Sequence, residues 1–217
     1  MNMSEGKKTA KFSVALGLFD YINPVFYTVT SLMILFHAGK ALGLSTPGLA
    51  VYALGAFVSL LFGFTIPTVK LMVGLGKMKF KMPVNLVFYV NTGILVSGLV
   101  LIKAVMKMSV PRFLILIAAV ICVLLLVLLK TKKPNSAAVL TGAFGYMMIY
   151  VSLISHALSK GITVCAVLYA AAICLFMFLC MVGMRWNLKD ARVHWVIEIC
   201  NVICQGAVAL STVLLFH

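Results

Sequence analysis

The chain has 217 residues, of which 64% are hydrophobic and 10% are charged, and its formal net charge is +14. A soluble domain of this size needs a charged surface, so the composition excludes one and predicts an integral membrane protein. The 18 Lys and Arg residues lie mainly at the ends of apolar runs. We interpret them as topology signals and headgroup contacts, and we expect no nucleic-acid partner.

Seven apolar runs are each long enough to cross a bilayer as a helix. A lone strand would leave its backbone unpaired in lipid, and no barrel-type alternation is present. The fold class that we predict is therefore all-α, a polytopic bundle of seven transmembrane helices in a single membrane domain over residues 1–217. The predicted spans are residues 12–36, 48–69, 84–102, 113–129, 136–158, 162–184 and 193–216.

The basic residues also predict the orientation of the bundle. Thirteen of the 18 fall on the side of the N-terminus once the spans alternate. Because cytoplasmic loops carry an excess of Lys and Arg, we expect a cytoplasmic N-terminus and a C-terminus outside. Trp186 and Trp195 flank the last inner loop, where an aromatic belt is expected. The membrane that we expect is a plasma membrane of the bacterial type.

The first run carries a polar face. Gly17, Asp20, Asn23 and Tyr27 follow one another at spacings of 3, 3 and 4 residues. Pro24 lacks an N–H, so it frees the carbonyl of Asp20 and predicts a kink there. A carboxylate beside a freed carbonyl within a membrane predicts a cation or proton site. For Asn23 and Tyr27, hydrogen bonding between helices is an equal alternative.

The second run is predicted to pack closely against its neighbours. Gly48, Gly55 and Gly63 are small residues that let helix backbones approach one another. Pro67 frees the carbonyl of Gly63 and predicts a hinge. Lys70, near the cytoplasmic end, is expected to extend its ammonium group to the membrane interface.

The middle runs differ sharply in polarity. Asn91 lies in run 84–102, and Tyr146 lies in run 136–158. Between them, run 113–129 is apolar on every side, so we expect it against lipid at the edge of the bundle.

The last run, residues 193–216, has the most informative polar face. His194, Glu198, Asn201 and Gln205 are spaced by 4, 3 and 4 residues, which places them on one side of a helix. An ionisable residue inside a membrane costs at least about 2.5 kcal/mol, so it usually faces the protein interior and has a function. His194, one turn before Glu198, could relay a proton to it.

A weak internal similarity suggests a repeat. Residues 17–21 and residues 142–146 share the pattern G-x-F-x-Y. A true repeat would make 12–106 and 136–216 parallel units joined by helix 113–129, a 3+1+3 plan of the kind found in transporters. No motif assigns the chain to a family.

The polar residues lie on runs that cross the membrane in the same direction, so we expect them to face one another around a cavity open to the cytoplasm. Pro24 and Pro67 are the candidate hinges. We predict no catalytic residue, no metal and no cofactor. The candidate solute- or ion-binding residues are Asp20, Asn23, Tyr27, Asn91, Tyr146, His194, Glu198, Asn201 and Gln205.

The predicted function is a transporter or channel for a small cationic or neutral polar solute, proton-coupled through Asp20 and Glu198. The expected partners are the lipid bilayer, the solute and, as a homo-oligomer, further copies of the chain. One alternative is a metal-dependent enzyme acting on lipid, with His194 and Glu198 as ligands and Asp20 as a further ligand or a base, although a third nitrogen ligand is missing. The other is a non-catalytic subunit of a larger membrane complex.

Overall fold

The computed structural model describes residues 12–79, 84–132, 134–185 and 190–217. These residues form helices and no strand, and seven of the helical segments are long and apolar enough to span a membrane. The predicted fold class is therefore confirmed. The elements are α1 (Val14–Asp20), α2 (Ile22–Met33), the π-helical turn η1 (Ile34–Ala38), α3 (Thr46–Gly74), α4 (Val84–Val105), α5 (Val110–Thr131), α6 (Pro134–Ser159), α7 (Thr163–Arg185) and α8 (Ala191–Phe216).

The first span is interrupted where the sequence predicts a kink. Helix α1 ends at Asp20, and α2 begins at Ile22 with Pro24 in its first turn. Because proline cannot donate a hydrogen bond to the preceding turn, the helix cannot continue regularly through this point. The π-helical turn that ends the span was not predicted, since its residues carry no Pro or Gly signal.

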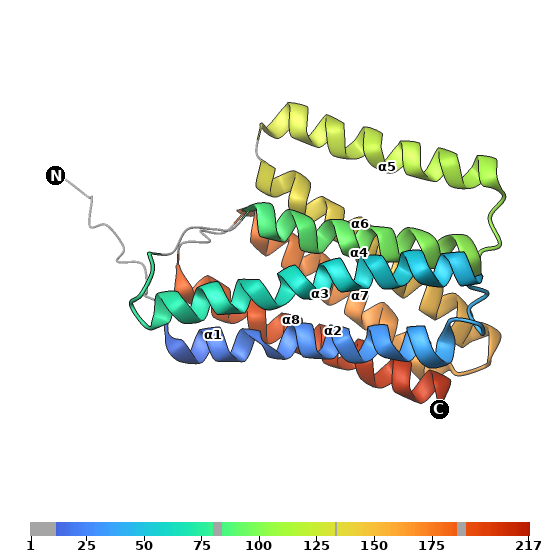
Figure 1. Cartoon of the computed structure of the whole chain (residues 1–217), viewed down its shortest axis with the longest axis horizontal. Coiled ribbons are helices and arrows are strands. Elements are labelled where there is room, and N and C mark those ends of the chain that lie inside the picture. Colours follow the sequence, from blue (N-terminus) through green and yellow to red (C-terminus); the bar gives the residue numbers. More distant parts are fainter. Residues whose placement is uncertain (1–11, 80–83, 133, 186–189) are drawn as a thin grey trace.

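Six of the seven spans form a closed ring. Helices α1 and α2 pack on α3, α3 on α4, α4 on α6, α6 on α7, and α7 on α8, which returns to α2. Helix α5 lies outside this ring, packs mainly on α6, and stands at the top edge of the molecule in Figure 1. Within α5, all of which the structure describes, Val120 is the one buried residue. Its predicted place at the edge of the bundle is confirmed, whereas the internal repeat and the membrane orientation stay predictions.

The ring is held together by a close backbone approach. A Cβ atom added to Gly55 of α3 would lie 2.7 Å from the carbonyl oxygen of Gly93 in α4. Only glycine fits such a contact, so the glycine-spaced face predicted for the second run does bring two helices together.

The two ends of the bundle differ in packing. We call the end where α1, α4, α6 and α8 begin the N-terminal end, and the end where α8 finishes the C-terminal end; Figure 1 places them at left and right. Most of the buried apolar cluster lies in the C-terminal half, and its members Tyr27 and Ile94 extend it toward the N-terminal half. Its members include Ile34, Ala38, Leu42, Tyr52, Leu101, Leu153, Ala157, Cys165, Tyr169, Val208 and Leu215. The C-terminal half is therefore a filled core.

Candidate functional site

A cavity of about 280 Å³ occupies the N-terminal half of the ring. Each of the six ring spans contributes to its wall, and most of the lining side chains are apolar. All nine candidate binding residues line it: Asp20, Asn23, Tyr27, Asn91, Tyr146, His194, Glu198, Asn201 and Gln205. Both candidate hinges, Pro24 and Pro67, line it as well. The roles assigned to these residues stay predictions.

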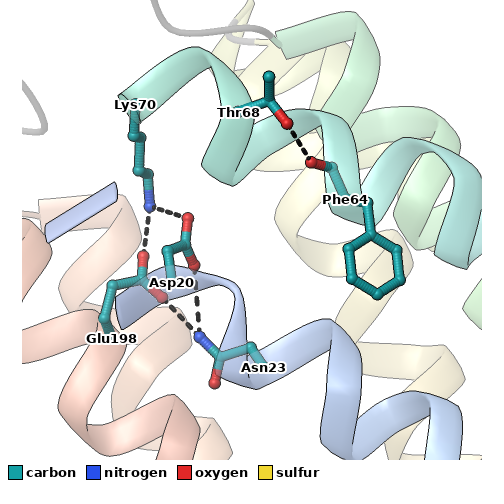
Figure 2. A network of polar contacts seen from close by, with 6 residues as sticks. All are labelled: Asp20, Asn23, Phe64, Thr68, Lys70 and Glu198. Carbon is teal, nitrogen blue, oxygen red and sulfur yellow. Dashed lines mark hydrogen bonds and ion pairs between the residues drawn. The ribbon is translucent and has the colours of Figure 1, made fainter. Parts of the chain in front are cut away.

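Lys70 corrects one expectation. Its ammonium group does not extend to the membrane interface: the residue is 5% exposed and also lines the cavity. Lys70 Nζ lies 2.8 Å from Asp20 Oδ2 and is also paired with Glu198 Oε1. Figure 2 shows the lysine reaching from α3 to carboxylates on α1 and α8. We call Asp20, Lys70 and Glu198 the charged triad.

Asn23 contacts both carboxylates of the triad from the side opposite Lys70. Its Nδ2 donates to Glu198 Oε2 at 2.7 Å and to Asp20 Oδ1 at 3.3 Å. Each carboxylate therefore has one oxygen on Lys70 and the other on Asn23, as Figure 2 shows. Charged groups removed from water are tolerated when they are paired and hydrogen-bonded in this way.

The local sequence explains how the triad is assembled. Helix α1 approaches α3 closely at Gly17, where an added Cβ would lie 2.6 Å from the Leu71 Cα atom. Asp20 lies one turn after Gly17 on the same face, and Lys70 precedes Leu71, so the two charges meet across this contact. Glu198 lies two turns into α8, whose first turn is capped by Asp190 Oδ1 accepting from the Arg192 N–H at 3.0 Å.

The sequence did contain a signal for Lys70. Ser59, Gly63, Ile66 and Lys70 are spaced by 4, 3 and 4 residues, which is the same spacing as the polar face of α8, and all four line the cavity. A lysine on the same face as the small residues Ser59 and Gly63 points toward the bundle interior rather than toward lipid. The wall from α7, which includes Phe176 and Cys180, carried no comparable polar signal.

Aromatic side chains line the part of the cavity away from the triad. Tyr27 meets Tyr146 edge to face with ring centroids 6.4 Å apart, and Tyr146 lies against Phe176 at 4.6 Å. The buried hydroxyl of Tyr27 lies beside the hydroxyls of Ser31, Ser59 and Ser97. This end of the cavity therefore offers aromatic surface together with a group of hydroxyls.

Two amides also hold helices together. Asn91 Nδ2 donates to the backbone carbonyl of Ala138 at 2.7 Å, which ties α4 to α6. Gln205 Nε2 donates to the Tyr150 hydroxyl at 3.4 Å, which ties α8 to α6. These contacts match hydrogen bonding between helices, which the sequence left as an alternative for such residues.

The ligand set of a metal site is not assembled in the described part of the chain. No group of three His, Cys, Asp or Glu side chains there could hold a metal ion. Asp20 and Glu198 face the ammonium group of Lys70 instead, and the ring of His194 packs on Phe12 with centroids 4.8 Å apart. The two carboxylates are therefore paired with a cation that the chain itself supplies.

No protein-family model matches the chain, and no curated protein or solved structure is significantly similar to it. The chemistry of the cavity is therefore argued from its own residues.

Proposed function

We propose that the protein is a membrane transporter or channel for a small cationic or neutral polar solute, proton-coupled through Asp20 and Glu198. The observation that carries the proposal is the contrast between the two halves of the bundle. The N-terminal half holds a cavity with a buried charged triad, and the C-terminal half is filled by apolar side chains. Buried charges at membrane depth are expensive and mark solute, ion or proton paths. The partners that we propose are the bilayer and the solute.

The charges support a cation or a proton as the transported or coupling species. The triad holds two carboxylates and one ammonium group, so its fully ionised form carries a net charge of −1. Lys70 adds a positive charge to a site for which the sequence predicted only the two acids. The sign of the site is nevertheless unchanged, and it disfavours anions.

The packing supports a cavity that is accessible from one side at a time. A transporter exposes its site alternately by moving groups of helices around it. Pro24 at the break between α1 and α2, and Pro67 within α3, both lie beside the triad in the cavity wall. Movement at these points would change the contact between α1, α3 and α8.

The proposal is tested by uptake into proteoliposomes. Labelled Na⁺, K⁺, guanidinium and erythritol are suitable probes because each crosses lipid slowly on its own. We expect at least one probe to enter faster than into protein-free liposomes. Asp20→Asn and Glu198→Gln should each reduce that rate by about tenfold or more, since each removes a charge from the path.

Lys77→Met is the matched control. Lys77 is exposed and follows the end of α3, so this substitution removes a lysine that does not line the cavity. Uptake by this variant should equal that of the wild type. The proposal is wrong if all four probes enter at the protein-free rate, or if the two acid variants transport like the wild type.

A further inference from the structure

We propose that the cavity takes up one positive charge at a time, either a proton or a small ammonium-type monocation, and that Lys70 is a built-in first cation that sets this limit. The inference rests on the proposed cation-binding function and deepens it by naming the class of solute. It concerns binding, so it can be tested without transport.

The first step is a charge count over the whole wall. Besides the triad, the lining groups that titrate are His194 on α8, Tyr27 on α2, Tyr146 on α6 and Cys180 on α7. Helix α4 contributes only uncharged lining residues: Val87, Val90, Asn91 and Ile94. With the phenols, the thiol and the imidazole neutral, the cavity lacks one positive charge. A proton on a carboxylate or on His194 supplies it, and so does a bound monocation.

The second step concerns the atoms available to a ligand. Asn23 uses its Nδ2 for both carboxylates, and among the described residues no donor reaches its buried Oδ1. That oxygen and the carboxylates beside it are all hydrogen-bond acceptors. A cluster of acceptors with a net negative charge favours a ligand that donates hydrogen bonds and carries positive charge, as an alkylammonium group does.

The third step concerns size and the far end of the site. At about 30 Å³ per water-sized group, a cavity of about 280 Å³ holds a solute of roughly nine heavy atoms. Glu198 and Gln205 both line the cavity and are seven residues apart, which is about 10 Å along α8. An ammonium group at the triad therefore leaves room for an apolar body against Tyr146 and Phe176.

The fourth step is the role of Lys70. Its ammonium group already occupies the place between two carboxylates that one end of a diamine would take. A second cation neutralises the triad, whereas a third would give a buried site an unpaired positive charge, which is costly. Replacing Lys70 with Met leaves the cavity short of two positive charges, so the site should then accept dications.

The test compares three probes of the same carbon length: 1-butylamine, 1,4-diaminobutane and 1-butanol. Binding to purified protein in detergent is measured by titration calorimetry at pH 7, in two buffers with different heats of ionisation. For the wild type we expect butylamine to bind about tenfold more tightly than either other probe. Binding should also release a proton, because the monocation replaces it.

Lys70→Met should reverse the preference, so that 1,4-diaminobutane binds about tenfold more tightly than butylamine. Lys70→Arg keeps the charge and should keep the wild-type preference. Should Lys70→Met not fold, Glu198→Gln serves instead, since its site is already neutral and it should bind butylamine no better than butanol. Lys77→Met is the control and should bind like the wild type.

The inference is overturned if none of the probes binds to the wild type, if butanol binds as well as butylamine, or if Lys70→Met keeps the wild-type preference. It fails separately from the proposed function. Charge-selective binding without uptake into proteoliposomes would refute transport alone, and uptake with an unchanged preference in Lys70→Met would refute the one-charge limit alone.

Discussion

At the scale of single residues, the charged triad concentrates the polar interactions of three helices at one point. Lys70 supplies the positive charge for both carboxylates, and Asn23 donates to the oxygens that Lys70 does not reach. Removing one partner of a buried ion pair leaves the other charge unpaired, at a cost of about 3–5 kcal/mol. The three charges should therefore not contribute equally to stability.

We expect Lys70→Met to be the most destabilising single change in the triad. It leaves two neighbouring carboxylates without a cation, whereas Asp20→Asn and Glu198→Gln each leave a neutral ion pair with Lys70. Thermal unfolding in detergent at pH 7 should rank Lys70→Met below both acid variants. The free energy of unfolding should fall by about 3 kcal/mol or more for Lys70→Met and by less for the others.

The exposed Lys77→Met is again the control, with stability expected within about 0.5 kcal/mol of the wild type. Equal stability of Lys70→Met and the wild type would show that the lysine does not compensate the two acids.

The polar site was largely predictable at this scale, with one instructive exception. Asp20 and Glu198 were identified because an ionisable residue inside a membrane is costly and usually faces the protein interior. Lysine has a long stem, so its position near the end of a span suggested the interface. Only the opposing acids on α1 and α8 make burial favourable, and that proximity depends on the ring.

At the scale of elements, the contact between α1 and α3 fixes the distance between Asp20 and Lys70. Gly17→Ala would place a methyl group 2.6 Å from the backbone of Leu71, so one helix must move. Overpacking of this kind costs about 1–3 kcal/mol. We expect Gly17→Ala to lower the unfolding temperature and to weaken whatever cation binding the wild type has.

Gly63→Ala is the matched control, because the nearest atom to its added Cβ is 3.9 Å away. Its stability should equal that of the wild type or exceed it by up to about 1 kcal/mol, since alanine favours a helix more than glycine does. If Gly17→Ala proves as stable as Gly63→Ala, the close approach at Leu71 does not constrain the triad.

The spans were predictable as elements because a helix that crosses the bilayer needs an apolar run as long as the bilayer is thick. Run 113–129 became α5 at the edge of the bundle, since an all-apolar helix has no face to bury against protein. The π-helical turn η1 was not predictable, because it depends on how the end of the first span packs rather than on residue type.

At the scale of the whole molecule, the filled and hollow halves predict access from one side. Asn201 lines the cavity and is partly exposed, whereas Ser211 is fully buried in the C-terminal half. In a background without native cysteines, without added solute and in the state that the structure shows, Asn201→Cys should react with a membrane-impermeant maleimide from the side of the N-terminal end only. Ser211→Cys should react from neither side.

Vesicles of opposite orientation separate the two sides. If the N-terminus is cytoplasmic, as the basic residues predict, labelling of Asn201→Cys requires inside-out vesicles. Equal labelling of Asn201→Cys from both sides would contradict the one-sided cavity.

The ring itself could not be derived from the sequence. Polar faces on spans of the same direction predicted that Asp20, Tyr146 and Glu198 would share a cavity, and the structure brings them together. Which helices are neighbours was not predictable, because small residues allow many pairings within a membrane. The contribution of α7 to the wall follows only from the closed order of contacts.

The position of α5 outside the ring has a consequence for biosynthesis. The largest contact between helices joins α4 to α6, yet α5 must be synthesised between them. At translation rates of about 5–20 residues per second, α4 waits a few seconds for its partner. During that interval the small-residue face of α4 is open to lipid or to other nascent chains. The ring can therefore close only late in translation, after α6, α7 and α8 have been synthesised.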